Sequence, residues 1–144
     1  MKAFVTRLRD VRERWLSPKA TDRQKRGAAG EAVAETFLRR ARLKILVRRY
    51  KCRYGEVDLV ARDKDTLVFI EVKTRRSAAF GDPAQAVTPE KQRHISRVAL
   101  HYLREIGNPQ IPVRFDIVEV LDDLTVPTCQ HLPDAFPLAA PYIY

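Results

Sequence analysis

Two strand-like segments joined by a short polar turn constrain the fold of this chain most strongly. Residues 54–61 and 66–73 are rich in the β-branched and aromatic side chains that favour strands, and residues 62–65 between them are Arg-Asp-Lys-Asp. This pattern predicts an antiparallel hairpin. Residues 67–70, Leu-Val-Phe-Ile, are apolar on both faces, so the second strand is expected in the centre of a sheet.

The segments on either side of the hairpin predict an α/β fold. A helix is expected to begin near Thr21-Asp22, and residues 45–47 predict a short strand that runs into Arg48-Arg49-Tyr50. A second helix is expected from Thr88-Pro89-Glu90 to Gly107, and a last strand over residues 113–120. The order helix, three strands, helix, strand predicts an α/β sandwich with a mixed central sheet flanked by helices. The last strand–helix–strand connection is long enough for a parallel crossover.

The length of 144 residues favours one domain with additions at both ends. Residues 1–20 predict a basic amphipathic arm, because apolar residues recur there at helical spacing between arginines. The domain itself is expected to span residues 21–125. Residues 126–144 predict a Pro-rich tail that packs on the domain or extends from it.

The composition narrows the class of protein. No apolar run reaches the roughly 18 residues that a membrane span needs, and residues 1–14 are too charged for a signal peptide. Cys52 and Cys129 have no motif spacing, so a reduced, cytoplasmic protein is expected. The net charge is +9, with +12 in residues 1–53 and −3 in residues 54–144. A basic half beside clustered carboxylates suggests a polyanionic partner and an acidic site, although a solvated basic face would give the same charge.

The hairpin carries the residues that could perform chemistry. Side chains alternate along a strand, so Glu56 shares a face with Asp58, and Glu71 shares a face with Lys73. If the two faces coincide, Asp58, Glu71 and Lys73 meet. Two carboxylates with a lysine suit Mg²⁺ or Mn²⁺ and the hydrolysis of a phosphodiester. A structural ion pair of Lys73 with a carboxylate would explain the same spacing, and the spacing alone does not separate the two hypotheses.

Asp58 followed by Glu71-Val72-Lys73 resembles the D…(D/E)-x-K signature of the restriction-endonuclease-like superfamily. Further blocks make the chain similar to the YraN family, small bacterial proteins predicted to be endonucleases and related to archaeal Holliday-junction resolvases. The matching blocks are Gly30-Glu31 and residues 55–61, 68–75 and 86–92. The sequence departs from the signature at Val57, where proline is expected. The resemblance implies a restriction-endonuclease-like sandwich.

The resemblance also implies roles for individual residues. Asp58 and Glu71 would be the ligands of Mg²⁺ or Mn²⁺, Lys73 the catalytic lysine, and Glu31 an acidic residue that the first core helix adds to the site. Glu56 belongs to the family motif. Because related resolvases act as dimers, a homodimer is implied as well.

The favoured hypothesis is therefore a Mg²⁺-dependent endonuclease acting on DNA, including branched or repair-intermediate structures. DNA would be recognised through its backbone, because no segment is typical of base recognition. The cations expected to contact phosphates are Arg75, Arg76, Lys91, Arg93 and Arg97. Two other classes fit the sequence: a non-catalytic nucleic-acid-binding protein that keeps the fold, and an interaction protein whose arm binds a partner or an anionic membrane surface.

Overall fold

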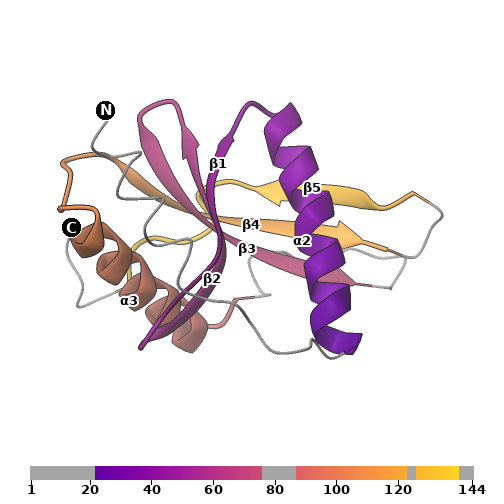
Figure 1. Cartoon of the computed structure of the whole chain (residues 1–144), viewed down its shortest axis with the longest axis horizontal. Coiled ribbons are helices and arrows are strands. Elements are labelled where there is room, and N and C mark those ends of the chain that lie inside the picture. The colour runs from indigo at the N-terminus through magenta and orange to yellow at the C-terminus, as the bar shows by residue number, and fades with distance from the viewer. Residues whose placement is uncertain (1–21, 76–86, 123–125, 140–144) are drawn as a thin grey trace.

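A computed structural model describes residues 22–75, 87–122 and 126–139, which form two helices and five strands (Figure 1). The elements are α2 (Asp22–Arg40), β1 (Lys44–Cys52), β2 (Gly55–Asp63), β3 (Thr66–Arg75), α3 (Pro89–Glu105), β4 (Val113–Leu121) and β5 (Thr128–Leu132). The predicted arm, residues 1–20, lies outside the described residues. Among the residues that are described, no helix combines the length and the apolar composition needed to cross a bilayer.

The five strands form one mixed sheet in the order β1-β2-β3-β4-β5. Neighbouring strands are antiparallel except β3 and β4, which are parallel and are joined through α3. Phe69 of β3 packs in the cluster that contains α3, and the next residue, Ile70, packs in the cluster that contains α2. The helices therefore cover opposite faces of the sheet, and the predicted α/β sandwich with a central hairpin is confirmed.

The start of α3 forms as its sequence predicts. Thr88 is the N-cap, and its hydroxyl oxygen accepts a hydrogen bond from the backbone N–H of Lys91 at 3.2 Å. Pro89 follows at the first helical position, and Glu90 lies in the first turn, where its charge favours the helix dipole. This start matters because it fixes Lys91 near the end of β3.

The sheet contains one strand that the sequence analysis did not predict. β5, Thr128–Leu132, lies in the segment that was expected to be a tail and pairs with β4. The buried carboxylate of Asp116 anchors it, accepting hydrogen bonds from His131 at 2.8 Å, from the backbone N–H of Asp134 at 2.9 Å, and from Arg114. Burial alone would raise the pKa of Asp116, but the hydrogen bonds to its carboxylate outweigh burial, and the pKa is lowered.

The helix α2 comes close to the sheet at Gly30. A Cβ atom at this position would lie 2.0 Å from the Oγ1 atom and 3.2 Å from the Cβ atom of Thr74 in β3. The glycine therefore allows a helix–strand approach that any side chain would block. Gly27, one turn earlier, has no heavy atom of the described residues within 4 Å of a Cβ built on it.

Gly30→Ala is expected to destabilise the fold by about 1–3 kcal/mol, because α2 must move away from Thr74 to make room. Gly27→Ala is the matched control and is expected to stabilise the helix by up to about 1 kcal/mol. Urea unfolding measures both changes. Equal stabilisation by the two substitutions would contradict the close approach at Thr74.

Candidate active site

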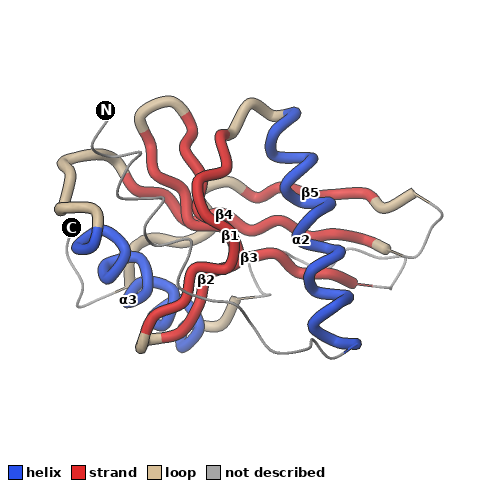
Figure 2. Tube along the Cα trace, viewed as in Figure 1, coloured by secondary structure: helices blue, strands red, loops and turns tan. Residues whose placement is uncertain are grey.

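The ladder between β2 and β3 ends before either strand does. Its last pair is Leu59 with Ile70; beyond it β2 continues only against β1, and β3 continues only against β4. Figure 2 shows the β1–β2 hairpin turning away from β3. Where the strands part, the backbone N–H of Val72 donates to Asp58 Oδ2 at 2.7 Å. The Asp58 carboxylate thus replaces a backbone acceptor at the fork between the strands.

Glu71 and Lys73 lie on the α3 side of the sheet. They follow Phe69 at alternate positions along β3, and Phe69 packs against α3. Glu71 is buried, with 4% of its surface exposed, and Lys91 at the start of α3 places its Nζ atom 3.8 Å from Glu71 Oε2. The fork therefore brings together two carboxylates and two lysines from β2, β3 and α3.

The two carboxylates of the fork resist ionisation. Burial raises the pKa of Asp58 to about 6, although the N–H of Val72 works in the opposite direction; the charges of Glu31 and Glu56 add to the rise. Burial, and then the charge of Asp58, raise the pKa of Glu71 to about 7, against the lowering effect of Lys91 and Lys73. At neutral pH the pair is an unfavourable concentration of negative charge that a cation would relieve.

Glu31 reaches the edge of this site from α2, and Arg49 holds it there. The Arg49 Nε atom donates to Glu31 Oε2 at 2.7 Å, while the preceding residue, Arg48, bonds Glu35 on the same helix. Consecutive strand residues normally face opposite sides, but Arg49 has a left-handed φ of 50°, which lets both arginines reach α2. The charge of Glu31 contributes to the raised pKa of Asp58, so the predicted third acid lies near the pair.

A fourth carboxylate, which the sequence analysis did not single out, lies on the other side of Lys73. Glu119 of β4 is fully buried and stands beside Lys73 in the parallel register. It forms an ion pair with Arg75, and neither of its oxygens has a hydrogen bond within the described structure. Arg75 is thus engaged inside the protein.

Two further cations predicted to contact DNA, Arg93 and Arg97, are exposed on α3, whereas Arg76 lies outside the described residues. Glu56, from the family motif, is half-exposed and lies 3.4 Å from the ammonium group of Lys51. The contact of Arg75, Arg76, Lys91, Arg93 and Arg97 with DNA stays a prediction.

The donor set at the fork fits a magnesium-type ion. Asp58 and Glu71 supply hard carboxylate oxygens, and Mg²⁺ commonly binds one or two carboxylates together with waters and phosphate oxygens. Among the residues described, no group of three or more His, Cys, Asp or Glu side chains is arranged to hold an ion. Because Arg49 engages Glu31, two carboxylates, rather than a complete protein cage, would hold such an ion.

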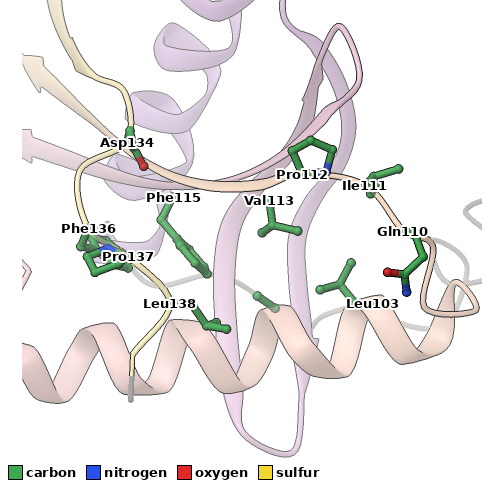
Figure 3. A pocket seen from close by; sticks show the side chains of 11 residues that line it. Leu103, Gln110, Ile111, Pro112, Val113, Phe115, Asp134, Phe136, Pro137 and Leu138 are labelled. Atoms are coloured by element: carbon green, nitrogen blue, oxygen red, sulfur yellow. The ribbon is translucent and has the colours of Figure 1, made fainter. Parts of the chain in front are cut away.

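A cavity in the described structure lies elsewhere. It has a volume of about 680 Å³ and opens between α3, the start of β4 and the segment that follows β5 (Figure 3). Apolar side chains such as Leu103, Phe115 and Phe136 line it, and Glu31, Asp58, Glu71 and Lys73 are not among its described lining residues. The carboxylate site is therefore separate from this cavity.

A mixed sheet between two helices, with an acidic fork where the central hairpin leaves the parallel strands, defines a restriction-endonuclease-like α/β sandwich. Within that class, the chain belongs to the uncharacterised protein family UPF0102, whose family model matches residues 30–120. The resemblance to the YraN family is confirmed.

Relatives from several bacteria carry the same family name. The UPF0102 protein of Geotalea daltonii is 48% identical over 119 residues, which are 82% of this chain and 94% of the relative. The protein of Nocardia farcinica is 52% identical over 100 residues, or 69% of this chain and 79% of the relative. The protein of Syntrophus aciditrophicus is 43% identical over 121 residues, or 83% and 94%. These names state a family and no activity.

Without metal, the free energy of unfolding is expected to fall as the pH rises from about 4 to about 7. In the unfolded chain the two carboxyl groups titrate near 3.8 and 4.5, whereas in the folded chain Asp58 and Glu71 titrate at about 6 and about 7. The folded state therefore binds more protons in this window, and its advantage is lost as they dissociate. Asp58→Asn, which keeps an oxygen for the Val72 N–H, is expected to be more stable than wild type at pH 8 by on the order of 2 kcal/mol.

Chemical denaturation across this pH range measures the effect, and Asp65→Asn, in the exposed β2–β3 turn, is the matched control. Added Mg²⁺ is expected to raise the Tm of wild type at pH 8 and to have little effect on Asp58→Asn, because one ligand is lost. Superimposable pH profiles for wild type and Asp58→Asn would contradict the charge repulsion at the fork.

Proposed function

We propose that this chain is a metal-dependent nuclease that hydrolyses the phosphodiester bonds of DNA. The observation that carries the proposal is a pair of carboxylates, half-buried Asp58 and buried Glu71, with raised pKa values and with Lys73 beside them. A structural ion pair would hold these acids at a lowered pKa, as Arg39 and Arg48 do for Glu35 in the same protein. The contrast favours a site that awaits a cation.

In the proposed reaction, the oxygen of a water molecule bonds to phosphorus, one P–O ester bond breaks, and the leaving oxygen takes a proton. Bound Mg²⁺ or Mn²⁺ would supply charge neutralisation and orientation of the water, with Asp58 and Glu71 as its protein ligands. The ammonium group of Lys73 would stabilise the negative charge that develops on the phosphate oxygens. Lys91 adds a second cation beside Glu71, and Glu31 adds an acid at the edge of the site.

The DNA backbone is the proposed point of recognition. Lys91, Arg93 and Arg97 follow one another from the site along α3, and cations in this arrangement attract phosphates regardless of sequence. Branched or repair-intermediate DNA is the proposed substrate class, and two copies of the chain would cut two strands. Both of these finer proposals follow from the likeness to resolvases.

The test is an incubation of the purified protein with linear, flapped and four-way DNA in Mg²⁺, Mn²⁺ or chelator. Cleavage is expected with either metal and is expected to stop in chelator, with paired cuts on the four-way substrate. Salt-sensitive DNA binding without cleavage in either metal would overturn the nuclease and leave a binding protein. The absence of DNA binding at low salt would overturn the nucleic-acid partner as well.

A further inference from the structure

The outer face of α3 meets the β1–β2 turn in a recess away from the fork. In Figure 1 this turn, at the lower left, lies against the helix. The recess has a volume of about 370 Å³, and we call it the turn–helix recess. Its lining residues are Tyr54, Arg97, Leu100, His101 and Arg104.

A network of polar and aromatic contacts fixes the groups of the recess in place. The hydroxyl of buried Tyr50 donates to Glu105 Oε2 at 2.9 Å and lies 2.7 Å from His101 Nδ1, which leaves Nε2 as the imidazole nitrogen for a ligand. The Tyr54 ring lies edge-on to His101, with 6.0 Å between centroids. The Arg53 guanidinium stands 4.8 Å from the Tyr54 centroid and donates to its hydroxyl at 2.6 Å. Tyr54 and His101 are therefore positioned before any ligand binds.

The chemistry of the recess suits a phosphodiester. Arg97 and Arg104 both line the recess, are exposed, and lie seven positions apart on the same face of α3. The guanidinium of Arg53, in the turn, contacts the ring of Tyr54. Guanidinium groups bind phosphate through paired hydrogen bonds, and an aromatic wall packs against the sugar or base beside it. We propose that the turn–helix recess binds a backbone phosphate of the same DNA molecule whose scissile bond lies at the fork. The position of that bond rests on the function proposed above.

The axis of α3 sets the distance between the two sites. Lys91 contacts Glu71 at the fork, and Arg97 and Arg104 follow it by six and thirteen residues. At about 1.5 Å per residue, they lie roughly 9 Å and 20 Å farther along the helix. A duplex advances about 3.4 Å per base pair, so these distances correspond to roughly three and six base pairs. The recess would therefore hold DNA to one side of the cut.

The test measures binding in chelator, so that it does not depend on cleavage. A fluorescent DNA duplex is titrated with wild type, with Arg104→Gln and with Arg40→Gln over a series of salt concentrations. Arg40 is the matched control, because it is also an exposed arginine in the last turn of a helix, and that helix, α2, covers the face of the sheet opposite to α3. Arg104→Gln is expected to weaken binding several-fold at low salt and to reduce the slope of log K against log salt by about 0.9. Arg40→Gln is expected to leave the slope unchanged.

A slope for Arg104→Gln equal to that of wild type, or an equal loss with Arg40→Gln, would overturn the recess as a phosphate site. The fork is tested separately by cleavage of saturating DNA in Mg²⁺ by wild type, with Arg40→Gln as the control that is expected to cleave at the same rate. If Arg104→Gln binds DNA more weakly while wild type cleaves no DNA, the recess is supported and the proposed nuclease activity is overturned. If wild type cleaves and Arg104→Gln binds DNA as wild type does, the nuclease is supported and the recess is overturned. If wild type does not bind DNA, both proposals are overturned.

Discussion

Lys73→Ala is expected to slow metal-dependent cleavage by about 10²- to 10³-fold, because it removes the positive group that faces the developing charge on the phosphate. DNA affinity is expected to change far less, since the cations on α3 remain. Asp58→Asn and Glu71→Gln are expected to remove most cleavage as well, because each takes away one of two metal ligands. In chelator these two variants are expected to bind DNA at least as tightly as wild type, because a carboxylate that repels phosphate is gone.

Lys64→Ala, in the exposed β2–β3 turn, is the matched lysine control and is expected to cleave like the parent. The Tm is measured beside the cleavage rate. If Lys73 serves only as a structural ion-pair partner, Lys73→Ala melts at a lower temperature while any cleavage is unaltered. A Lys73→Ala protein that cuts as fast as the parent in Mg²⁺ would end the nuclease assignment of the fork.

Arg75→Ala is expected to destabilise the protein by about 3 kcal/mol, the lower end of the range for breaking a buried ion pair. The reason is that Glu119, with 0% of its side chain exposed, keeps its charge and loses the partner that balances it. Lys73 still stands beside Glu119 in the register, which limits the loss. Urea unfolding measures the change in the free energy of unfolding.

Lys51→Ala supplies the comparison, because the Lys51–Glu56 pair is half-exposed on both sides and spans 3.4 Å. Exposed pairs contribute about 0–1 kcal/mol, so this variant is expected to be near wild type. The double variant Arg75→Ala/Glu119→Gln is expected to recover part of the lost stability, because position 119 then carries no buried charge. A loss for Arg75→Ala as small as that for Lys51→Ala would contradict the burial of the pair.

The elements that the sequence predicted are those with a strong local signal. Residues 67–70 had to form a central strand because they are apolar on both faces, and Thr88-Pro89 had to begin a helix because of its capping chemistry. The strand β5 has no such signal: Thr128–Leu132 is short and mixed in polarity, and its sides are exposed or half-exposed. Its pairing depends on the buried carboxylate of Asp116, which lies twelve or more positions earlier in the chain.

The candidate site divides in the same way. The alternation of side chains predicted that Asp58, Glu71 and Lys73 meet if the faces of the two strands coincide. Alternation could not predict that Arg49 contacts Glu31, because the contact needs a left-handed φ at Arg49, inside a strand. The local sequence gives no sign of this backbone angle. Glu119 was hidden for another reason: glutamate is rarely buried, whereas Glu119 is fully buried because both faces of β4 are covered.

Gly30 and Glu31 are consecutive, so the place where α2 presses on the sheet is also the place where it delivers its carboxylate. A design that grafts this site onto another scaffold must transfer the two residues together. A helix with a Cβ atom at the position of Gly30 lies farther from the sheet, and the carboxylate of Glu31 moves away from the site with it. Natural sequence drift faces the same restriction. Substitution of exposed residues of α2 such as Ala32 and Thr36 leaves this approach unchanged, whereas substitution of Gly30 does not.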